Sequence, residues 1–224
     1  MKRELLMPQY VIWNLGQSVQ SRSLDALAVA PMETETTIPS KPEPGSKPWI
    51  LCLGAVHGDE IEGVWLLEEM RSQWSSHYPF RNIGVILWAQ VNPDGVALGQ
   101  RWNANNIDLN RNLPTKDWSP EVKNPRYPPG TAPASEPENK ALLSLISACK
   151  PQAILSVHSF REYQINSNGP ARPWAEQLAA VCGYPVTENI GYPTPGSLGT
   201  YTGAERQIPT ITLEDRRRTR LLKR

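Results

Sequence analysis

The sequence contains few cysteines and no long apolar run, and both shortages limit the class of protein that it can be. Its 224 residues include three cysteines, which are odd in number and far apart in the chain: Cys52, Cys149 and Cys182. This pattern argues against a disulfide framework and favours a reducing compartment. No apolar segment is long enough for a signal peptide or a membrane span. We therefore expect a cytoplasmic protein that has no membrane partner.

The chain also has no excess of charge of either sign. Its 23 basic and 22 acidic residues give a net charge of +1, which indicates no preference for an acidic partner. The exception is the segment 215–224, which is rich in arginine and lysine. A basic run of this kind could bind nucleic acid, but a solvated tail is the commoner case. We expect a basic C-terminal tail and no nucleic-acid partner, and the sequence leaves the oligomeric state open.

The spacing of the glycines and the small number of histidines limit the kinds of binding site that the sequence can form. The glycines of segment 191–203 do not have the spacing of a phosphate-binding loop, which argues against a nucleotide site. Only three histidines occur in the chain. His77 lies in a polar Ser-Ser-His-Tyr-Pro stretch, whereas His57 and His158 each follow an apolar run directly.

Apolar runs bounded by turn residues predict the strands, and amphipathic patterns predict the helices. The predicted strands cover residues 10–13, 24–30, 49–56, 82–91, 153–157 and 208–213. The predicted helices run from about residue 61 to 74, from a Ser135–Glu138 capping box to about 150, and from 173 to 181. A turn is predicted at Asn92–Gly95 and loops at 31–48, 99–134 and 191–203.

A strand, a helix and a second strand in succession predict a parallel βαβ unit. No internal repeat and no clear boundary divides the sequence, so we expect one α/β domain over residues 1–224. The long predicted loop 99–134 is unusual inside a compact domain unless it has a function.

Two of the predicted strands end in a histidine and a third ends in a glutamate. His57 and His158 each follow a strand, at the carboxyl end where open α/β sheets bind their ligands. Glu60 follows His57 by three residues and could face the same ion. Two imidazoles and a carboxylate with an open fourth position suit catalytic zinc, although ligand type alone leaves iron and manganese open.

Further residues could perform the chemistry around such an ion. Glu214 ends the last predicted strand and could take a proton from water, or it could be a structural partner of a nearby arginine. Arg101 and Arg111 lie in the long loop among several asparagines. They could bind a carboxylate or stabilise an oxyanion, or the loop could be merely polar.

These residues, taken in order, resemble the zinc carboxypeptidase family. The matching motifs are His57–Glu60, Asn92–Gly95, Asp108–Asn112, His158 and Glu214. Within the family, the stretch 191–201 and the Ser135–Glu138 sequence are most similar to the bacterial murein peptide amidase branch. The resemblance covers about residues 49–214 and implies one α/β domain with a mixed, mostly parallel, twisted sheet between helices.

The resemblance also implies a role for each motif residue. His57, Glu60 and His158 would bind one Zn²⁺ ion. Glu214 would be the general base and then the acid, and Arg101 would polarise the scissile carbonyl.

On the substrate side, the resemblance implies that Asn110 and Arg111 bind the free C-terminal carboxylate and that Tyr192 covers the substrate. The expected function is hydrolysis of a small peptide with a free carboxylate, and the expected bond is the γ-D-glutamyl–diaminopimelate bond of murein peptides. Two alternatives remain: an acyl-amino-acid deacylase of the aspartoacylase and desuccinylase type, and a non-catalytic protein that binds murein fragments.

Overall fold

Four parallel strands form the centre of the structure. The computed structural model describes residues 7–31, 38–43, 48–75, 78–160 and 163–216. The central strands, in spatial order, are β4 (Gly84–Trp88), β3 (Trp49–Leu53), β5 (Ala153–Phe160) and β8 (Thr210–Arg216). All four were predicted as apolar runs, because a parallel sheet with helices on both faces buries both sides of its strands.

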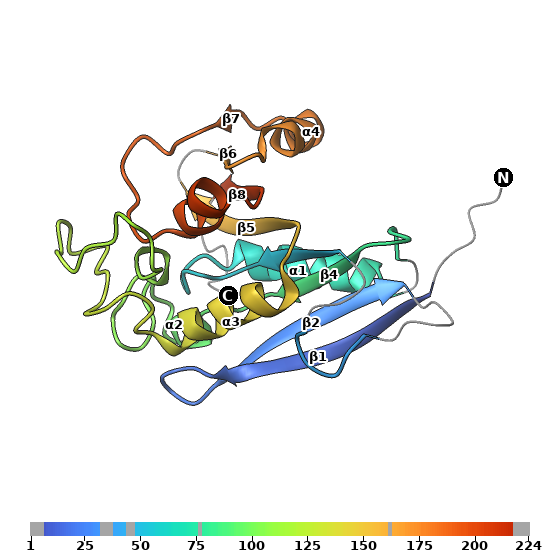
Figure 1. The fold of residues 1–224 in the computed structure, drawn as a ribbon, viewed down its shortest axis with the longest axis horizontal. Helices are drawn as coiled ribbons and strands as arrows, with labels where there is room; N and C mark the ends of the chain where they lie inside the picture. Colours follow the sequence, from blue (N-terminus) through green and yellow to red (C-terminus); the bar gives the residue numbers. More distant parts are fainter. Residues whose placement is uncertain (1–6, 32–37, 44–47, 76–77, 161–162, 217–224) are drawn as a thin grey trace, which may run out of the picture.

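Antiparallel strands extend this centre at both edges (Figure 1). On the β4 side, β2 (Ser23–Pro31) and then β1 (Pro8–Gln17) are added as a hairpin. On the β8 side, β6 (Gln164–Asn168) pairs antiparallel, and β7 (Val186–Thr187) pairs parallel to β6. Among the described residues, the sheet therefore has eight strands and mixed but mostly parallel pairing. The predicted fold class is confirmed.

Helices cover both faces of the sheet. On one face, α1 (Glu62–Gln73) packs against β3, β4 and β5, and its Leu67 lies in a cluster with Cys52. On the same face, α4 (Arg172–Cys182) packs against β6 and β7. On the opposite face, α3 (Pro137–Cys149) places Leu142 and Leu145 in the larger core cluster, which also contains Leu51. Neighbouring residues of β3 thus enter different clusters, as strand alternation requires.

The sequence Asn92–Gly95 begins a helix, so the predicted turn is wrong. The short helix α2 (Pro93–Leu98) starts there, with Pro93 at its first position. The side chain of Asn92 accepts a hydrogen bond from the backbone N–H of Gly95 at 2.8 Å. Asparagine followed by proline is a signal for a helix start as well as for a turn, and the cap decided between them.

The predicted capping box of α3 is also wrong. The helix begins at Pro137, its cap residue is Glu136, and no side chain caps it. Ser135 Oγ donates to the Glu136 carboxylate at 2.6 Å instead. The carboxylates of Glu136 and Glu138 both accept from the side-chain amide of Asn103, at 2.7 and 3.2 Å. A contact with a distant segment has replaced the local reciprocal cap.

Besides α2, four short elements were not predicted, and one of them is the 3₁₀ helix η1 (Leu109–Arg111) inside the predicted loop 99–134. Strands β6 and β7 are short, and β6 contains the polar residues Asn166 and Ser167, so no apolar run announces it. The π-helix η2 (Gly199–Ala204) lies inside the predicted loop 191–203. His77, most of the predicted loop 31–48 and most of the basic tail lie outside the described residues. Among the helices of the described part, none has the length and apolar character to span a membrane.

The burial of the cysteines makes a simple test of the fold. Burial raises the pKa of the Cys52 thiol to about 12 and that of Cys149 to about 11, whereas Cys182 is exposed. Since the thiolate is the reactive form, a chromogenic thiol reagent at pH 8 should modify one cysteine rapidly in the native protein and all three after unfolding. Rapid modification of three thiols in the native protein would contradict the packing of β3 and α3.

Candidate metal centre and active site

The loop after β3 positions His57 and Glu60. The strand ends at Leu53, earlier than predicted, and His57 lies four residues beyond it. Gly58 allows the loop to lie directly on α2, because a Cβ at this position would overlap the backbone of Gly95 and Val96. The loop therefore turns back toward the carboxyl edge of the sheet.

His158 and Glu214 lie inside strands, not just after them as predicted. Strand β5 continues to Phe160 and β8 to Arg216. The two residues are register partners on these neighbouring parallel strands. Since alternate residues of a strand face the same side, Ser156, His158 and Glu214 all face the side of the sheet that α3 covers. The strands extend beyond the apolar run because their polar ends line the site.

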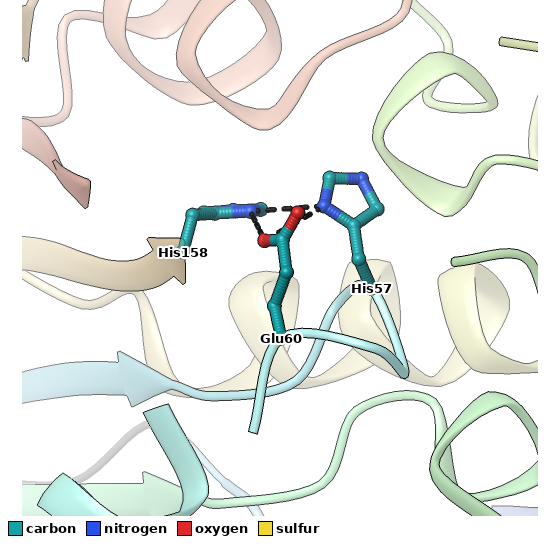
Figure 2. A group of neighbouring side chains, drawn as sticks. All are labelled: His57, Glu60 and His158. Carbon is teal, nitrogen blue, oxygen red and sulfur yellow. Dashed lines mark hydrogen bonds and ion pairs between the residues drawn. The ribbon is translucent and has the colours of Figure 1, made fainter. Parts of the chain in front are cut away.

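Three ligand atoms meet at one point beside this edge (Figure 2). Nδ1 of His57 is 3.0 Å from Oε2 of Glu60, and Nδ1 of His158 is 2.9 Å from the same oxygen. The two Nδ1 atoms are 3.1 Å apart. All three residues are at most 4 % exposed. Among the described residues, no other group of three histidine, cysteine or acidic side chains has this arrangement.

The outer nitrogen of each imidazole has its own partner. Nε2 of His57 is 3.1 Å from Asp108 Oδ1, and Nε2 of His158 is 3.0 Å from Ser156 Oγ. If each Nε2 carries the ring proton and donates it there, both Nδ1 lone pairs point at the Glu60 oxygen. With both Nδ1 atoms unprotonated, three acceptors meet in a buried place, and a bound cation would offset their repulsion.

The donor set and its spacing fit zinc. Zinc–ligand bonds of about 2.0–2.2 Å in a tetrahedron separate the ligand atoms by about 3.3 Å. The observed separations of 2.9–3.1 Å are only a few tenths of an ångström shorter. Two imidazoles and one carboxylate also leave a fourth position open.

The charges within the cluster shift the protonation of its members. Burial and the nearby Arg101 lower the pKa of His57, but the carboxylates of Glu60 and Asp108 outweigh them and raise it. Burial raises the pKa of Glu60, but His57 and His158 outweigh it and hold this pKa well below its usual range. Glu60 is therefore ionised, as a metal ligand must be.

Asp108 is a site residue that the sequence analysis did not single out. It is fully buried. In addition to its contact with His57, it accepts hydrogen bonds from Nε and Nη2 of Arg101 at 3.0 and 2.9 Å. His57 and Arg101 together hold the pKa of Asp108 well below its usual range despite burial. Its place at the start of the Asp108–Asn112 motif was the available signal.

Arg101 and Arg111 reach the same cavity from the long segment before α3. Arg101 contacts Glu60 Oε1 at 3.3 Å as well as Asp108. Arg111 ends the short 3₁₀ helix η1 (Leu109–Arg111) and donates to Asn110 O at 2.6 Å. Asn110 Oδ1 accepts from the backbone N–H of Leu198 at 2.8 Å, which ties η1 to the segment before the π-helix.

One cavity of about 810 Å³ is lined by every residue that the sequence analysis proposed for the site. These residues are His57, Glu60, Arg101, Asn110, Arg111, His158, Tyr192 and Glu214. Burial and the Glu60 carboxylate raise the pKa of Glu214, and they outweigh the opposite effects of the two histidines and Arg101. The arrangement therefore combines a metal-ligand triad, a carboxyl group and two guanidinium groups in one space.

Comparison with known proteins agrees with this geometry. A sequence profile of the zinc carboxypeptidase family matches residues 6–211. The chain belongs to the zinc carboxypeptidase family. It is a hydrolase of that family, and its cofactor is zinc.

Its curated relatives include two enzymes named murein peptide amidase A. The enzyme from Vibrio campbellii is 33% identical over 180 residues, which are 73% of this chain and 68% of that protein. The enzyme from Escherichia coli K12 is 34% identical over 176 residues, which are 73% of this chain and 69% of that protein.

Solved structures show the same fold. The murein-tripeptide amidase from Escherichia coli O157 superimposes with a TM-score of 0.70 at 28% identity, covering 95% of this chain and 84% of that one. Carboxypeptidase A from Helicoverpa armigera has a TM-score of 0.70 at 18% identity, covering 94% of this chain and 59% of that one, and shows the fold alone.

Loss of the Asp108 carboxylate should weaken metal binding. We expect Asp108→Asn to lower zinc affinity about tenfold to a hundredfold, because His57 loses the partner that sets its tautomer and orientation. Competition with a chromogenic chelator measures this affinity. Asp25→Asn, at an exposed position on β2, is the matched control and should bind zinc as the parent does. Unchanged affinity in Asp108→Asn would show that Asp108 does not support the metal site.

Proposed function

We propose that this zinc carboxypeptidase hydrolyses a small peptide with a free C-terminal carboxylate, and that the preferred bond is the γ-D-glutamyl–diaminopimelate bond of murein peptides. The observation behind this proposal is the convergence of the ligand triad, Glu214, Arg101 and Arg111 in one cavity. The names of the two amidase relatives support a murein peptide as the substrate.

In this proposal, His57, Glu60 and His158 hold the zinc ion. When bound, zinc lowers the pKa of a water molecule at its open position and polarises a carbonyl oxygen. Asp108 and Ser156 hold the two imidazoles in the tautomer that presents Nδ1. Ser159 N donates to Glu60 Oε2 at 3.2 Å and supports the carboxylate.

Glu214 moves the proton in this mechanism. Its carboxylate takes a proton from the attacking water and then passes it to the nitrogen of the leaving group. Its raised pKa suits this double role, because a carboxyl group is a better proton carrier when its pKa lies closer to the working pH. The guanidinium of Arg101 donates to the carbonyl oxygen as negative charge develops there.

The remaining residues bind the C-terminal part of the substrate. Arg111 pairs with the free carboxylate, and the amide of Asn110 lies beside it in the same helix η1. Tyr192 lines the cavity, where burial and a hydrogen bond with Tyr127 raise its pKa to about 12. Its hydroxyl group therefore stays protonated well above pH 7 and remains a hydrogen-bond donor.

The part of the cavity wall formed by β6 and β8 is polar, which favours a polar substrate. Asn166 and Asn168 of β6 lie on the same face of the sheet as Thr212 and Glu214 of β8, because Asn166 is the register partner of Thr212. Ser197 and neighbouring polar residues form another part of the wall. Amides and hydroxyls offer both donors and acceptors, which the amino and carboxylate groups of a diaminopimelate side chain require.

An assay with three substrates tests the proposal. The purified zinc-loaded protein should release diaminopimelate from L-Ala-γ-D-Glu-diaminopimelate and should not act on N-acetyl- or N-succinyl-amino acids. Preferential cleavage of the acylated amino acids would favour the deacylase. Tight binding of the murein tripeptide without hydrolysis would favour the binding protein.

Removal of the Glu214 proton acceptor should separate catalysis from metal binding. We expect Glu214→Gln to keep its zinc and to lose at least about a hundredfold in kcat, the usual contribution of general acid–base catalysis. Asp215→Asn is the control, because Asp215 is the next residue and accepts from Tyr184 on the other face of β8. Metal analysis and steady-state rates measure both. Parent-like turnover in Glu214→Gln would remove Glu214 from the mechanism.

We further propose that the protein acts in the cytoplasm on peptides released during peptidoglycan recycling. The free cysteines support a reducing compartment, and the amidase relatives support the pathway. Cell fractionation and the accumulation of murein tripeptide in a deletion strain would test this location and role.

A further inference from the structure

Tyr127 occupies a central position among the charged residues of the cavity, although no motif pointed to it. Its ring centroid is 5.1 Å from the Cζ of Arg101 and 4.9 Å from the Cζ of Arg111. The ring of Tyr192 stacks on it at 6.1 Å between centroids, with an angle of 19° between the planes. One aromatic ring thus contacts both guanidinium groups and another tyrosine that lines the cavity.

The backbone around Tyr127 is held to the segments that bear these arginines. Carbonyl groups on both sides of Tyr127 in the sequence accept hydrogen bonds of 2.8–2.9 Å: Arg126 O from Trp102 Nε1, Pro128 O from Asp108 N, and Pro129 O from Asn112 Nδ2. Trp102 follows Arg101, Asn112 follows Arg111, and Asp108 binds Arg101 directly. The ring position is therefore fixed relative to both guanidinium groups.

The ring and Asp108 restrain Arg101 in different ways. Asp108 accepts two hydrogen bonds from the guanidinium, which fixes the direction of its N–H groups. The face of the tyrosine ring attracts the cation and limits its other movements. Arg111 donates a hydrogen bond from Nη1 to the carbonyl of the neighbouring Asn110, and its guanidinium contacts the same ring. Two like charges are thereby kept at a set separation beside one ring.

We propose that Tyr127 is a positioning residue that sets the distance and orientation between Arg101 and Arg111 and provides the surface on which Tyr192 rests. The part concerning the substrate rests on the proposed function, in which Arg101 holds the carbonyl and Arg111 the terminal carboxylate of one peptide. Tyr127 then determines how far apart those two groups of the substrate must be. Without the ring, the arginines separate and the requirement for a free carboxylate weakens.

A nuclear magnetic resonance experiment tests the positioning without reference to activity. The Cζ atoms of Arg101 and Arg111 lie 5.1 and 4.9 Å from the ring centroid, so we expect the ring current to shift the guanidinium resonances upfield. Tyr127→Leu should then move the Arg101 and Arg111 resonances downfield. Tyr127→Phe keeps the ring and should leave them shielded. Tyr10→Leu, on the outer strand β1, is the matched control and should leave both resonances unchanged. Unchanged Arg101 and Arg111 resonances in Tyr127→Leu would overturn the proposal.

A kinetic experiment tests the consequence for the substrate. The parent enzyme is compared on the murein tripeptide and on the same peptide with a C-terminal carboxamide. In Tyr127→Leu, the ratio of the two kcat/KM values should fall about tenfold, in line with the loss of a desolvated cation–π contact, chiefly through a higher KM for the free acid. Tyr127→Phe should restore the ratio to within about threefold of the parent.

The two experiments distinguish the possible failures. A general loss of stability in Tyr127→Leu would lower both rates and leave the ratio unchanged, which would overturn the role in substrate alignment. If the parent cleaves neither peptide, the proposed function fails, and the arginine resonances alone decide whether Tyr127 positions the guanidinium groups. Zinc content, measured in each variant, should equal that of the parent.

Discussion

The close approach of three buried electron pairs is the constraint on which the rest of the site depends. Nδ1 of His57, Nδ1 of His158 and Oε2 of Glu60 lie 2.9–3.1 Å from one another. When both Nδ1 atoms are unprotonated, this contact is unfavourable without a cation, and a zinc ion would turn it into three bonds. The Asp108 carboxylate can only accept and therefore favours the ring proton on Nε2 of His57, and the Ser156 hydroxyl can accept the corresponding proton of His158. These outer contacts orient the imidazoles of the metal site.

The charges around this point are arranged in alternation. The carboxylates of Glu60 and Asp108 face His57, and the guanidinium of Arg101 bridges the same two carboxylates from the other side. Among the described residues, Glu214 forms no ion pair with an arginine or lysine, and its pKa is raised. The pKa values of Glu60 and Asp108, which pair with His57 and Arg101, are lowered. This difference fits the proposal that Glu214 moves protons while the paired carboxylates hold the site together.

Strand alternation explains how one sheet serves both the core and the cavity. On β8, Ile211 and Leu213 enter the cluster beneath α4, whereas Thr212 and Glu214 line the cavity on the other face. On β6, Ile165 enters the same cluster and Asn166 faces the cavity. Because the cavity-facing residues of β6 are polar, the sequence of this strand contains no apolar run from which it could be predicted.

Much of the fold could be predicted because central parallel strands that helices cover on both faces contain recognisable apolar runs. The runs that became β3, β4, β5 and β8 were recognisable for this reason, and the order of histidines and glutamates after them indicated the carboxyl edge of the sheet. The start of α2 and the cap of α3 could not be predicted, since short polar signals fit several local structures. The Asn92 cap decided the first, and a contact with the distant Asn103 decided the second.

The amino-acid sequence by itself determined the chemical inventory: two imidazoles and a carboxylate for one ion, a further glutamate, and arginines in a long loop. Only the tertiary structure decided which atoms meet, that Asp108 bonds to both His57 and Arg101, and that Tyr127 lies against both guanidinium groups. Local patterns report how a residue relates to its own strand or helix. The distance between side chains dozens of residues apart is set by how the sheet and the long loop pack together, and no local pattern contains it.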